Sequence, residues 1–583
     1  MPTLARALLY ARTLRHLRWE QWLYRPLRAL QMRRPPRPAP PGAVAVERVR
    51  ALADAVRAWP TPPTPAVLRA ADAVVAGRFR FLNHEEVLTQ IDWQRRYVSH
   101  LWSYNLHYFD YAPELARAFR ATGDVGYVRR LEVLAEGWIR GTAGGRGDGW
   151  EPYALSLRAV NWIYALLLLG EALGPAARAA MEESLRAQLA FLQRRLELHV
   201  LGNHLQKNLK ALAVGGLYFS GRAAESWLRK GSRLLWRELH EQVLPDGVHY
   251  ERSPMYHALA LADFLEVADL LRAAGQPVPE PAVARIGRMA QAFGVLCRPN
   301  GTLHLFQDAA QGIAPRRPWL DVMARRVVGH GIPEPAGCLA LPDAGYFGWV
   351  DAVAGERLLV DCGAPGPAYQ PGHAHCGLLG FELDLAGRPV LVDAGVSGYD
   401  GDPLREYVRS TRAHNTVSIA GREQSEVWGT FRLARRATVR AADQACPDGA
   451  YRFSGACVPY HTRSAIHRRT VERVGGAWKV TDRVTGAPGA PLTSYLHFHP
   501  DFEVRAAGRA VTARADRVAV RVEPFGVDDV VVRRGEWGAA PQGWHCPEFG
   551  VALPAAALEM RLGAADDHEF GYRIRLVEEG RDA

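Results

Sequence analysis

Apolar residues recur at helical spacing from about residue 45 to residue 330, in leucine- and alanine-rich stretches that end at Gly or Pro. The clearest stretch, residues 253–275, begins with Ser253 as a suitable N-cap and Pro254 in the first helical position, and it ends at Gly275. One face of this helix carries Leu261, Leu265, Ala268 and Leu271. Many such helices in succession predict an α/α array or toroid.

The pattern changes after about residue 343 to short β-branched runs that tight turns join. FELDL and PVLVDA flank the turn Ala386-Gly387-Arg388, and VERV and AWKVTDRV flank Gly475-Gly476, so both pairs predict antiparallel hairpins. Helices first and strands afterwards predict a multidomain α+β chain. Because the sequence also has no GxGxxG or P-loop motif, we expect no Rossmann-type cofactor site.

A chain of 583 residues is too long for one hydrophobic core. The segment RRPPRPAPP at residues 33–41 cannot continue a helix and predicts a linker. We therefore expect three parts: a basic amphipathic N-terminal segment with its linker at residues 1–41, a helical domain at 42–335 and an antiparallel β domain at 336–583.

The net charge of +11 is concentrated in the first 50 residues, where eleven arginines and two glutamates give +9. A solvated helix face explains this excess, and so does contact with anionic lipid at a membrane surface or with an acidic glycan. No basic motif with interleaved aromatic residues indicates nucleic-acid binding. No apolar run approaches the roughly 20 residues of a membrane span, so we expect no transmembrane segment. Arginines among the first leucines argue against a cleavable signal peptide.

The cysteines are scattered along the chain, and their spacing indicates no CxxC pair and no disulfide framework. They therefore do not identify the cellular compartment. The seven are Cys297, Cys338, Cys362, Cys376, Cys446, Cys457 and Cys546.

The densest polar cluster, residues 370–395, is followed by His414. His373 and His375 are two residues apart, so we expect them to share one face of an extended strand and to point into a cleft. His375, Asp393 and His414 would form a two-histidine, one-carboxylate set that suits zinc and leaves an open position. Hydrogen-bonded structural histidines explain the same residues without a metal.

Two further clusters open predicted helices. Asn203, in the string GNHL, is either the N-cap of its helix or a functional amide. Tyr256 stands in the first turn if Ser253 is the cap, where the helix macrodipole favours a phenolate and would lower the pKa of this phenol from about 10, as a tyrosine base requires. A core aromatic residue is the other interpretation of Tyr256.

Six strings in order along both halves resemble those of heparinase II/III-type proteins, an alginate lyase/heparinase-like family. They are WSYNLHYFDY (102–111), WEPYALSLRAVNW (150–162), GNHLQKNLKAL (202–212), DGVHYERSPMYH (246–257), QPGHAH (370–375) and HNTVSIAGREQSEVWGTFR (414–432). The resemblance implies an N-terminal (α/α) toroid packed on a C-terminal antiparallel β-sandwich. It also implies a polysaccharide lyase that cleaves a uronic-acid-containing glycan by β-elimination and leaves an unsaturated uronate end.

Matched motif by motif, the resemblance implies a role in β-elimination for each of the candidate catalytic residues. Asn203 and His204 would bind the uronate carboxylate, and Tyr256 would protonate the leaving oxygen and, in a syn elimination, first act as base. His373 would be the base for the other epimer, and Tyr399 would be a further phenol in the cleft, with Tyr407 as a weaker candidate.

The resemblance also places the proposed zinc ligands His375, Asp393 and His414 on the family's metal positions, where the ion would organise the site. The chain departs from the family at Cys376-Gly377, where an acidic residue is common. The groups that surround the proposed zinc ligands are therefore expected to differ from those of the family. Supporting residues, whose chemistry suits sugar faces and carboxylates or else core packing, are Trp102, Asn105, His107, Trp150, Tyr153 and Arg158.

Two other functions fit the same residues. A catalytically weak glycan-binding protein of an exopolysaccharide system would keep the cleft for an acidic polysaccharide, and a zinc hydrolase such as a deacetylase would use a metal-bound water. The family resemblance favours the periplasm or cell envelope, whereas the expected lack of a signal peptide favours the cytoplasm.

Overall fold

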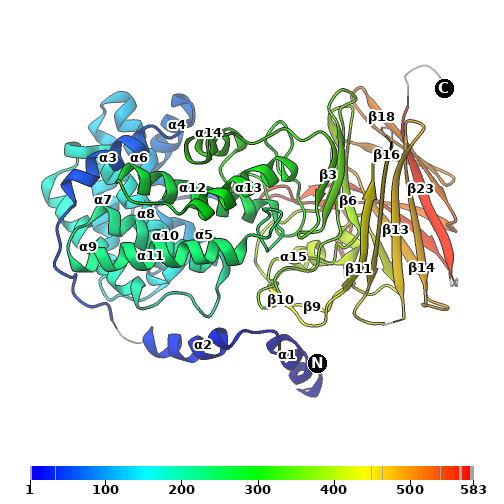
Figure 1. Cartoon of the computed structure of the whole chain (residues 1–583), viewed down its shortest axis with the longest axis horizontal. Helices are drawn as coiled ribbons and strands as arrows, with labels where there is room; N and C mark the ends of the chain where they lie inside the picture. The colour runs from blue at the N-terminus through cyan, green and yellow to red at the C-terminus, as the bar shows by residue number, and fades with distance from the viewer. Residues whose placement is uncertain are drawn as a thin grey trace.

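The computed structural model of the chain describes residues 3–32, 35–447, 450–462, 464–538, 540–563 and 567–577. A helical N-terminal half packs end to end against a β-sheet C-terminal half (Figure 1), which confirms the predicted multidomain α+β fold. The last long helix ends at Val328 and the first strand of the β half begins at Gly337, a few residues earlier than the change in hydrophobic pattern. The domain limits 42–335 and 336–583 stay a prediction.

Several successive helices of the N-terminal half pack against one another, and α8 and α10 lie in the middle of the array, in contact with each other and with α3 and α9. The helices are α3 (Val46–Arg57), α4 (Thr64–Val75), α5 (His100–Tyr108), α6 (Tyr111–Thr122), α7 (Val125–Gly141), α8 (Pro152–Leu169), α9 (Pro175–Gln193), α10 (Gly202–Tyr218), α11 (Arg222–Gln242), α12 (Pro254–Ala273), α13 (Glu280–Leu296) and α14 (Arg317–Val328). One hairpin, β1 (Arg78–Phe81) with β2 (His84–Val87), corrects the prediction of helix throughout this half.

Helix α12 forms as the sequence predicts. Ser253 is its N-cap, and the Oγ atom of Ser253 accepts a hydrogen bond from the backbone N–H of Tyr256 at 3.3 Å. Pro254 occupies the first helical position, and the chain leaves the helix through Gly275, whose φ of +66° a side chain would strain. This cap fixes the place of Tyr256 at the N-terminal end of α12.

One segment of the described chain, Pro152–Ala172 in and just beyond α8, is long and apolar enough to cross a bilayer by length and composition, which the sequence reading did not anticipate. Its most apolar part is 78% buried inside the protein, in the middle of the helical array. The apolar character of α8 is therefore explained by its place in the core.

The C-terminal half is built from antiparallel sheets that share one core. A five-stranded sheet (order β3-β4-β5-β6-β7) and a four-stranded sheet (β19-β22-β15-β8) pack against an eight-stranded sheet (β11-β12-β13-β14-β23-β18-β17-β16). Figure 1 shows β3 and β6 on the side of the helices, and β13, β14 and β23 on the far side.

The strands of the three large sheets are β3 (Gly337–Leu341), β4 (Tyr346–Asp351), β5 (Glu356–Asp361), β6 (Gly380–Leu385), β7 (Arg388–Leu391), β8 (Val417–Ile419), β11 (Thr438–Ala445), β12 (Tyr451–Val458), β13 (Ile466–Val474), β14 (Ala477–Thr485), β15 (Leu492–His497), β16 (Glu503–Ala507), β17 (Ala510–Ala515), β18 (Val518–Phe525), β19 (Asp529–Arg534), β22 (Ala556–Leu562) and β23 (His568–Leu576). Both predicted hairpins, β6–β7 and β13–β14, are confirmed. The smaller elements are β9 (Val427–Trp428), β10 (Arg432–Leu433), β20 (Trp544–His545), β21 (Leu553–Pro554) and the helix α15 (Pro403–Arg409).

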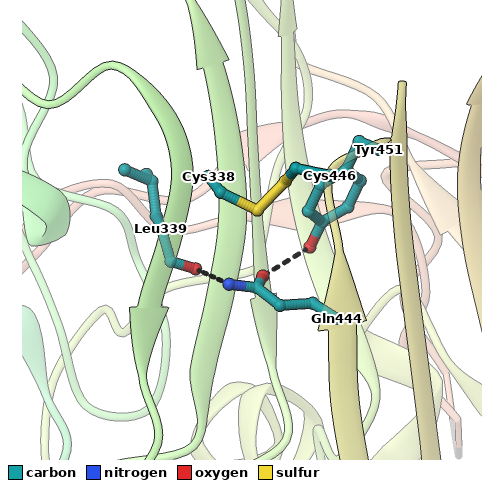
Figure 2. Close-up of a disulfide and its surroundings, with 5 residues drawn as sticks. All are labelled: Cys338, Leu339, Gln444, Cys446 and Tyr451. Atoms are coloured by element: carbon teal, nitrogen blue, oxygen red, sulfur yellow. Dashed lines mark hydrogen bonds between the residues drawn. A yellow bond between two sulfur atoms is a disulfide. The ribbon is translucent and has the colours of Figure 1, made fainter. Parts of the chain in front are cut away.

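A disulfide joins Cys338 in β3 to Cys446 just after β11 (Figure 2), a pairing that the spacing of the cysteines did not indicate. The two are 108 residues apart, so only the stacking of the two sheets brings them together. The side chain of Gln444 joins the same two sheets, because its amide donates to the carbonyl of Leu339 at 2.9 Å. The other five cysteines are buried as free thiols.

Before the array come two helices, α1 (Thr3–Leu14) and α2 (Trp19–Gln31), which lie along the helical half and reach the β half at β9 and β10 (Figure 1). Tyr10 of α1 stacks edge-on against Trp428 of β9, with ring centroids 4.9 Å apart. The predicted amphipathic N-terminal segment is therefore helical and joins both halves. Two residues of the predicted linker, Arg33 and Arg34, lie outside the described residues.

Candidate active site

A cavity of about 720 Å³ lies where the helical half, the β half and the N-terminal helices meet. It is lined by most of the residues that the sequence singled out as catalytic: Asn203, His204, Tyr256, His373 and Tyr399. The lining residues that the structure describes include three arginines and five histidines but one carboxylate, Asp400. Such a lining favours an anionic ligand.

Asn203 enters the cavity at the N-terminal end of α10. It lies inside the helix and Leu201 is the N-cap, so the capping interpretation of Asn203 is wrong. Gly202 has a φ of +58°, and a Cβ there would lie 2.4 Å from Oε1 of Gln370, so only glycine fits. Within the described chain the buried Oδ1 of Asn203 has no hydrogen-bond partner, which leaves this oxygen free to accept a hydrogen bond from a ligand.

Next to Asn203, the side chain of His204 follows the wall of the cavity. Its Nδ1 atom lies 3.1 Å from Oε1 of Glu197, and its ring lies 4.4 Å from the ring of Tyr153. Glu197 is fully buried and its pKa is lowered, because His204, Arg28 and Asn208 outweigh the effect of burial. An ionised Glu197 therefore orients His204 toward the cavity.

Tyr256 and Tyr399 meet across the cavity, with their phenol oxygens 2.8 Å apart. The ring of Tyr256 also lies 4.1 Å from that of His373. The expected lowering of the pKa of Tyr256 is wrong, since burial and the nearby Tyr399 raise it well above 10. Desolvation outweighs the helix macrodipole here, so the free protein holds Tyr256 as a neutral phenol that can donate a proton.

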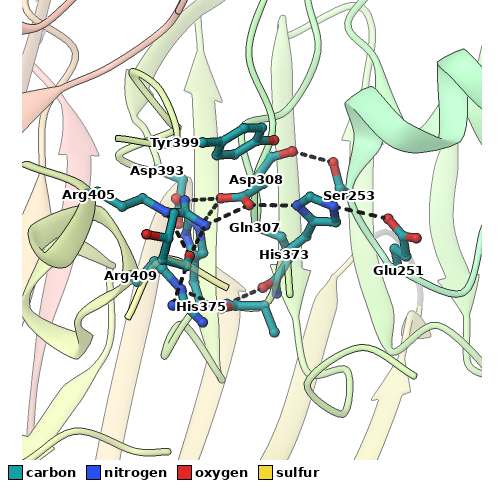
Figure 3. Close-up of polar contacts among 12 residues, drawn as sticks. Glu251, Ser253, Gln307, Asp308, His373, His375, Asp393, Tyr399, Arg405 and Arg409 are labelled. Atoms are coloured by element: carbon teal, nitrogen blue, oxygen red, sulfur yellow. Dashed lines mark hydrogen bonds and ion pairs between the residues drawn. The ribbon is translucent and has the colours of Figure 1, made fainter. Parts of the chain in front are cut away.

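His373 lies in a turn rather than in the expected extended strand, and this turn separates it from His375: the former lines the cavity and the latter is buried behind it. Nδ1 of His373 lies 2.8 Å from Oδ2 of Asp308, whereas Nε2 is 3.8 Å from Oε2 of Glu251 (Figure 3). An ionised Asp308 favours the tautomer with the proton on Nδ1, in which Nε2 is the nitrogen that can accept a proton.

Asp308 is the central residue that the sequence reading missed. It comes from the irregular segment between α13 and α14, is fully buried, and accepts hydrogen bonds from His373, His375 and Arg405 (Figure 3). Burial raises the pKa of its carboxyl, but Arg405 and the two histidines hold it well below the usual range. The pair Gln307-Asp308 stands between apolar residues, which was the only local signal of its role.

His375, Asp393 and His414 come together as predicted: one possible ligand atom of each lies within 4.8 Å of the others. In each residue one buried atom has no hydrogen-bond partner, namely Nδ1 of His375, Oδ1 of Asp393 and Nε2 of His414. Asp308 holds the other nitrogen of His375 at 2.8 Å. These orphaned atoms are the ones that a metal would use, so the donor set fits zinc.

The supporting residues divide into two groups. Asn105 and Tyr153 line the cavity, whereas the other four lie outside its lining, among them Arg158, which stacks on Trp138 at 3.7 Å and bonds Gln188. The remaining three are Trp102, His107 and Trp150, all buried. Tyr407 is also fully buried away from the cavity, where its hydroxyl accepts from the backbone N–H of Trp544 at 3.4 Å. Core packing explains this second group.

The fold and the site thus define a toroid-and-sandwich protein whose cavity joins a tyrosine pair to a carboxylate-held histidine. The chain belongs to the heparinase II/III-like family: residues 66–317 match the heparinase II/III N-terminus, and residues 333–569 match the heparinase II/III-like C-terminal domain.

Relatives lie at some distance. FtsZ-localized protein C of Caulobacter vibrioides is 26% identical over 267 residues, which cover 46% of this chain and 43% of that protein. Heparin-sulfate lyase of Bacteroides thetaiotaomicron is 26% identical over 189 residues, which cover 31% of this chain and 26% of that protein. The chain thus aligns with less than half the length of these relatives. The crystal structure of heparinase III superposes with a TM-score of 0.72 at 18% identity, over 91% of this chain and 89% of that one.

Proposed function

We propose that this protein is a polysaccharide lyase that cleaves an acidic, uronic-acid-containing glycan by β-elimination. The observation that carries the proposal is the meeting of Asn203, Tyr256 and His373 on one cationic cavity. Relatives named heparin-sulfate lyase support it.

β-Elimination sets three tasks, and a group in the cavity suits each. The substrate carboxylate must be neutralised while negative charge develops on it, the C5 proton must be removed, and the glycosidic oxygen must be protonated as its bond to C4 breaks. Asn203, with His204 beside it in the cavity, would bind the carboxylate through the N–H donors of its side-chain Nδ2. Tyr256, a neutral phenol in the free protein, would protonate the leaving oxygen.

The base differs with the epimer of the uronic acid. In the tautomer that Asp308 favours, Nε2 of His373 would take a proton that the substrate presents on the side of the β half. In a syn elimination Tyr256 would first have to lose its phenol proton to solvent; as a phenolate held by the hydroxyl of Tyr399, it would take the C5 proton and then pass that proton to the leaving oxygen. Tyr256, with Tyr399 as its hydrogen-bond partner, would thus act as acid for one epimer and as base and then acid for the other.

We further propose that His375, Asp393 and His414 hold a zinc ion that organises the site. When bound, zinc would fix the rings of the two histidines and neutralise the charge of Asp393. The carboxylate of Asp308 would link the fixed ring of His375 to that of His373, because it bonds both histidines. Asp308 of the helical half is therefore a carboxylate partner of His375, although this chain has Cys376 where the family often has an acidic residue.

A zinc hydrolase such as a deacetylase is the weaker assignment. Its metal-bound water would have to meet the substrate, yet His375, Asp393 and His414 are each at most 2% exposed and none of them lines the cavity. A glycan-binding protein without activity would not need the tyrosine pair or the oriented His373. Both remain outcomes of the experiment below.

For the location we propose the periplasm or cell envelope. The disulfide between Cys338 and Cys446 supports this, because disulfides persist in oxidising compartments and are rare in the cytoplasm. The substrate would then be an acidic polysaccharide of the envelope, such as an exopolysaccharide.

The test incubates the purified protein with a panel of uronate polysaccharides and follows the ultraviolet absorbance of the unsaturated product. We expect the wild type to produce this absorbance and Tyr256→Phe to lower kcat by about 10²- to 10⁴-fold. Tyr407→Phe is the matched control, since it removes a buried phenol outside the cavity, and it should retain activity. New reducing ends without the absorbance would indicate a hydrolase, and binding without cleavage on every glycan would indicate a binding protein.

A further inference from the structure

The N-terminal helices face the protein with their polar side. Gln21 of α2 is 2% exposed and its side chain donates to the carbonyl of Tyr369 at 3.3 Å. Arg18 stacks over the ring of Tyr369 at 3.8 Å and pairs with Glu241. These contacts hold the polar face of α2 on the body of the protein.

At the far end of α2 the same face makes more polar contacts. Arg28 pairs with Glu151, and its guanidinium lies 2.7 Å from Nε2 of His199. On α1, the hydroxyl of Thr13 accepts from the indole of Trp428 at 3.0 Å. Helix α2 is therefore fixed to the body mainly by polar groups, whereas α1 also buries Leu9 and packs Tyr10 against Trp428.

The apolar side of α2 faces away from the protein, and part of that of α1 does so too. On α2 it is a stripe at helical spacing, formed by Trp19, Trp22, Leu23, Leu27 and Leu30, which are 36% to 67% exposed. On α1 the exposed leucines are Leu4 and Leu8. A surface helix of a globular protein normally has the opposite orientation, with the apolar stripe on the core. A patch of this kind marks an interaction site.

Charge identifies what covers the stripe. Arg6 of α1 and Arg15 just after α1 are exposed, and within the described residues 3–32 the only carboxylate is that of Glu20. Two copies of so cationic a surface would repel each other, whereas an anionic surface would attract it. Tryptophan and leucine beside arginine are also the composition of helices that lie in the interface of a bilayer.

We propose that α1 and α2 form a membrane-docking surface that binds the face of an anionic lipid bilayer. The apolar stripe inserts between the headgroups, and the exposed arginines contact lipid phosphates. The polar face of α2 stays on the body, so docking needs no unfolding of the helices. Because α1 and α2 also line the cavity, the docked protein holds the candidate active site directly above the bilayer.

The test is flotation of the full-length protein with phosphatidylcholine vesicles, with and without phosphatidylglycerol. We expect it to float with the anionic vesicles and to be released by salt. Trp22→Glu with Leu23→Glu should weaken binding at least about tenfold, since both apolar side chains leave the stripe. Val353→Glu, which adds a charge at a fully exposed apolar residue of the β half, is the matched control and should float like the wild type.

Two results would overturn the proposal. One is a contrary flotation result: either the wild type does not float with anionic vesicles, or the double variant floats as well as the wild type. The other is a lipid-free dimer, seen by light scattering after gel filtration, that the double variant converts to monomer; a second copy would then cover the stripe. Thermal unfolding of the double variant confirms that it is folded.

Discussion

The Nδ1 atom of His373 lies 2.8 Å from Oδ2 of Asp308, and this contact joins the two halves of the molecule at the candidate active site. Asp308 belongs to the segment that follows α13, whereas His373 belongs to the turn between β5 and β6. The buried, ionised carboxylate of Asp308 favours the tautomer of His373 with the proton on Nδ1. In this tautomer Nε2 is the nitrogen that can accept a proton.

We predict that Asp308→Asn lowers kcat by about 10²-fold or more and changes KM much less. An amide in this place can present an N–H to His373, which would favour the wrong tautomer, while the substrate contacts of Asn203 and His204 stay in place. Steady-state kinetics on the cleaved glycan gives both constants. Asp482→Asn is the matched control, because Asp482 is likewise a fully buried partner of an arginine and a histidine, but far from the cavity. Equal losses of kcat in both variants would mean that Asp308 acts through stability alone.

The same Asp482 gives a prediction on stability. It bonds Arg469 with both oxygens at 2.8 Å, and Arg469 also donates to the carbonyl of Leu379, so Asp482→Asn leaves a buried cation without its counter-charge. We expect the free energy of unfolding near neutral pH to fall by about 3 kcal/mol, as measured by denaturant titration.

The pH dependence of this loss follows from the pKa of Asp482. Arg469 and His467 outweigh the effect of burial and lower the pKa of Asp482 from 3.8 to about 2. The carboxylate therefore stabilises the fold fully above about pH 4, and that contribution, of about 2 kcal/mol, is lost as the pH falls toward about 2. The difference between wild type and Asp482→Asn should accordingly shrink at about pH 3; a constant difference would contradict the assignment.

Metal content tests the zinc proposal without any assay of activity. We expect about one zinc per chain by elemental analysis of protein purified without chelator, and loss of that zinc in His414→Ala, since two ligands hold the ion poorly. The apparent melting temperature of the wild type should fall on chelation. His467→Ala removes a buried histidine that is outside the triad and should keep its zinc. A wild type that is folded and metal-free after reconstitution with zinc would rule the proposal out.

The disulfide should contribute to the stability of the β half. Cys338→Ser is expected to lower the free energy of unfolding by about 2 to 4 kcal/mol, because the open chain gains freedom over a loop of 108 residues. Cys446→Ser should cost the same, and the double variant no more than either single one. Additive losses would show that the two sulfurs are not bonded in solution.

Elements with a local cause could be predicted from the sequence. The cap at Ser253, the proline after it and the glycine turns of the two hairpins each depend on a few adjacent residues, and all formed as expected. The clustering of His375, Asp393 and His414 was also expected, because the family resemblance fixes their positions, and the three residues do come together; their binding of zinc stays a proposal.

Features that depend on the packing of distant segments could not be predicted. Asp308 is a single carboxylate in an apolar stretch, and only the docking of the two halves places it between His373 and Arg405. The pairing of Cys338 with Cys446 depends in the same way on two stacked sheets. The direction of the pKa of Tyr256 was predicted wrongly because helix position is visible in a sequence and burial is not.

The shared carboxylate of Asp308 has a consequence for hybrids made between such proteins. Each half of the chain supplies what the other cannot make: the helical half gives Asp308, Asn203 and Tyr256, and the β half gives His373 and Arg405. A recombinant that took one half from this chain and the other from a distant relative would bury an ionised carboxylate without its cations, or the cations without the carboxylate. The two halves of this protein should therefore be exchanged together, and not one at a time, in any hybrid that is meant to keep the site.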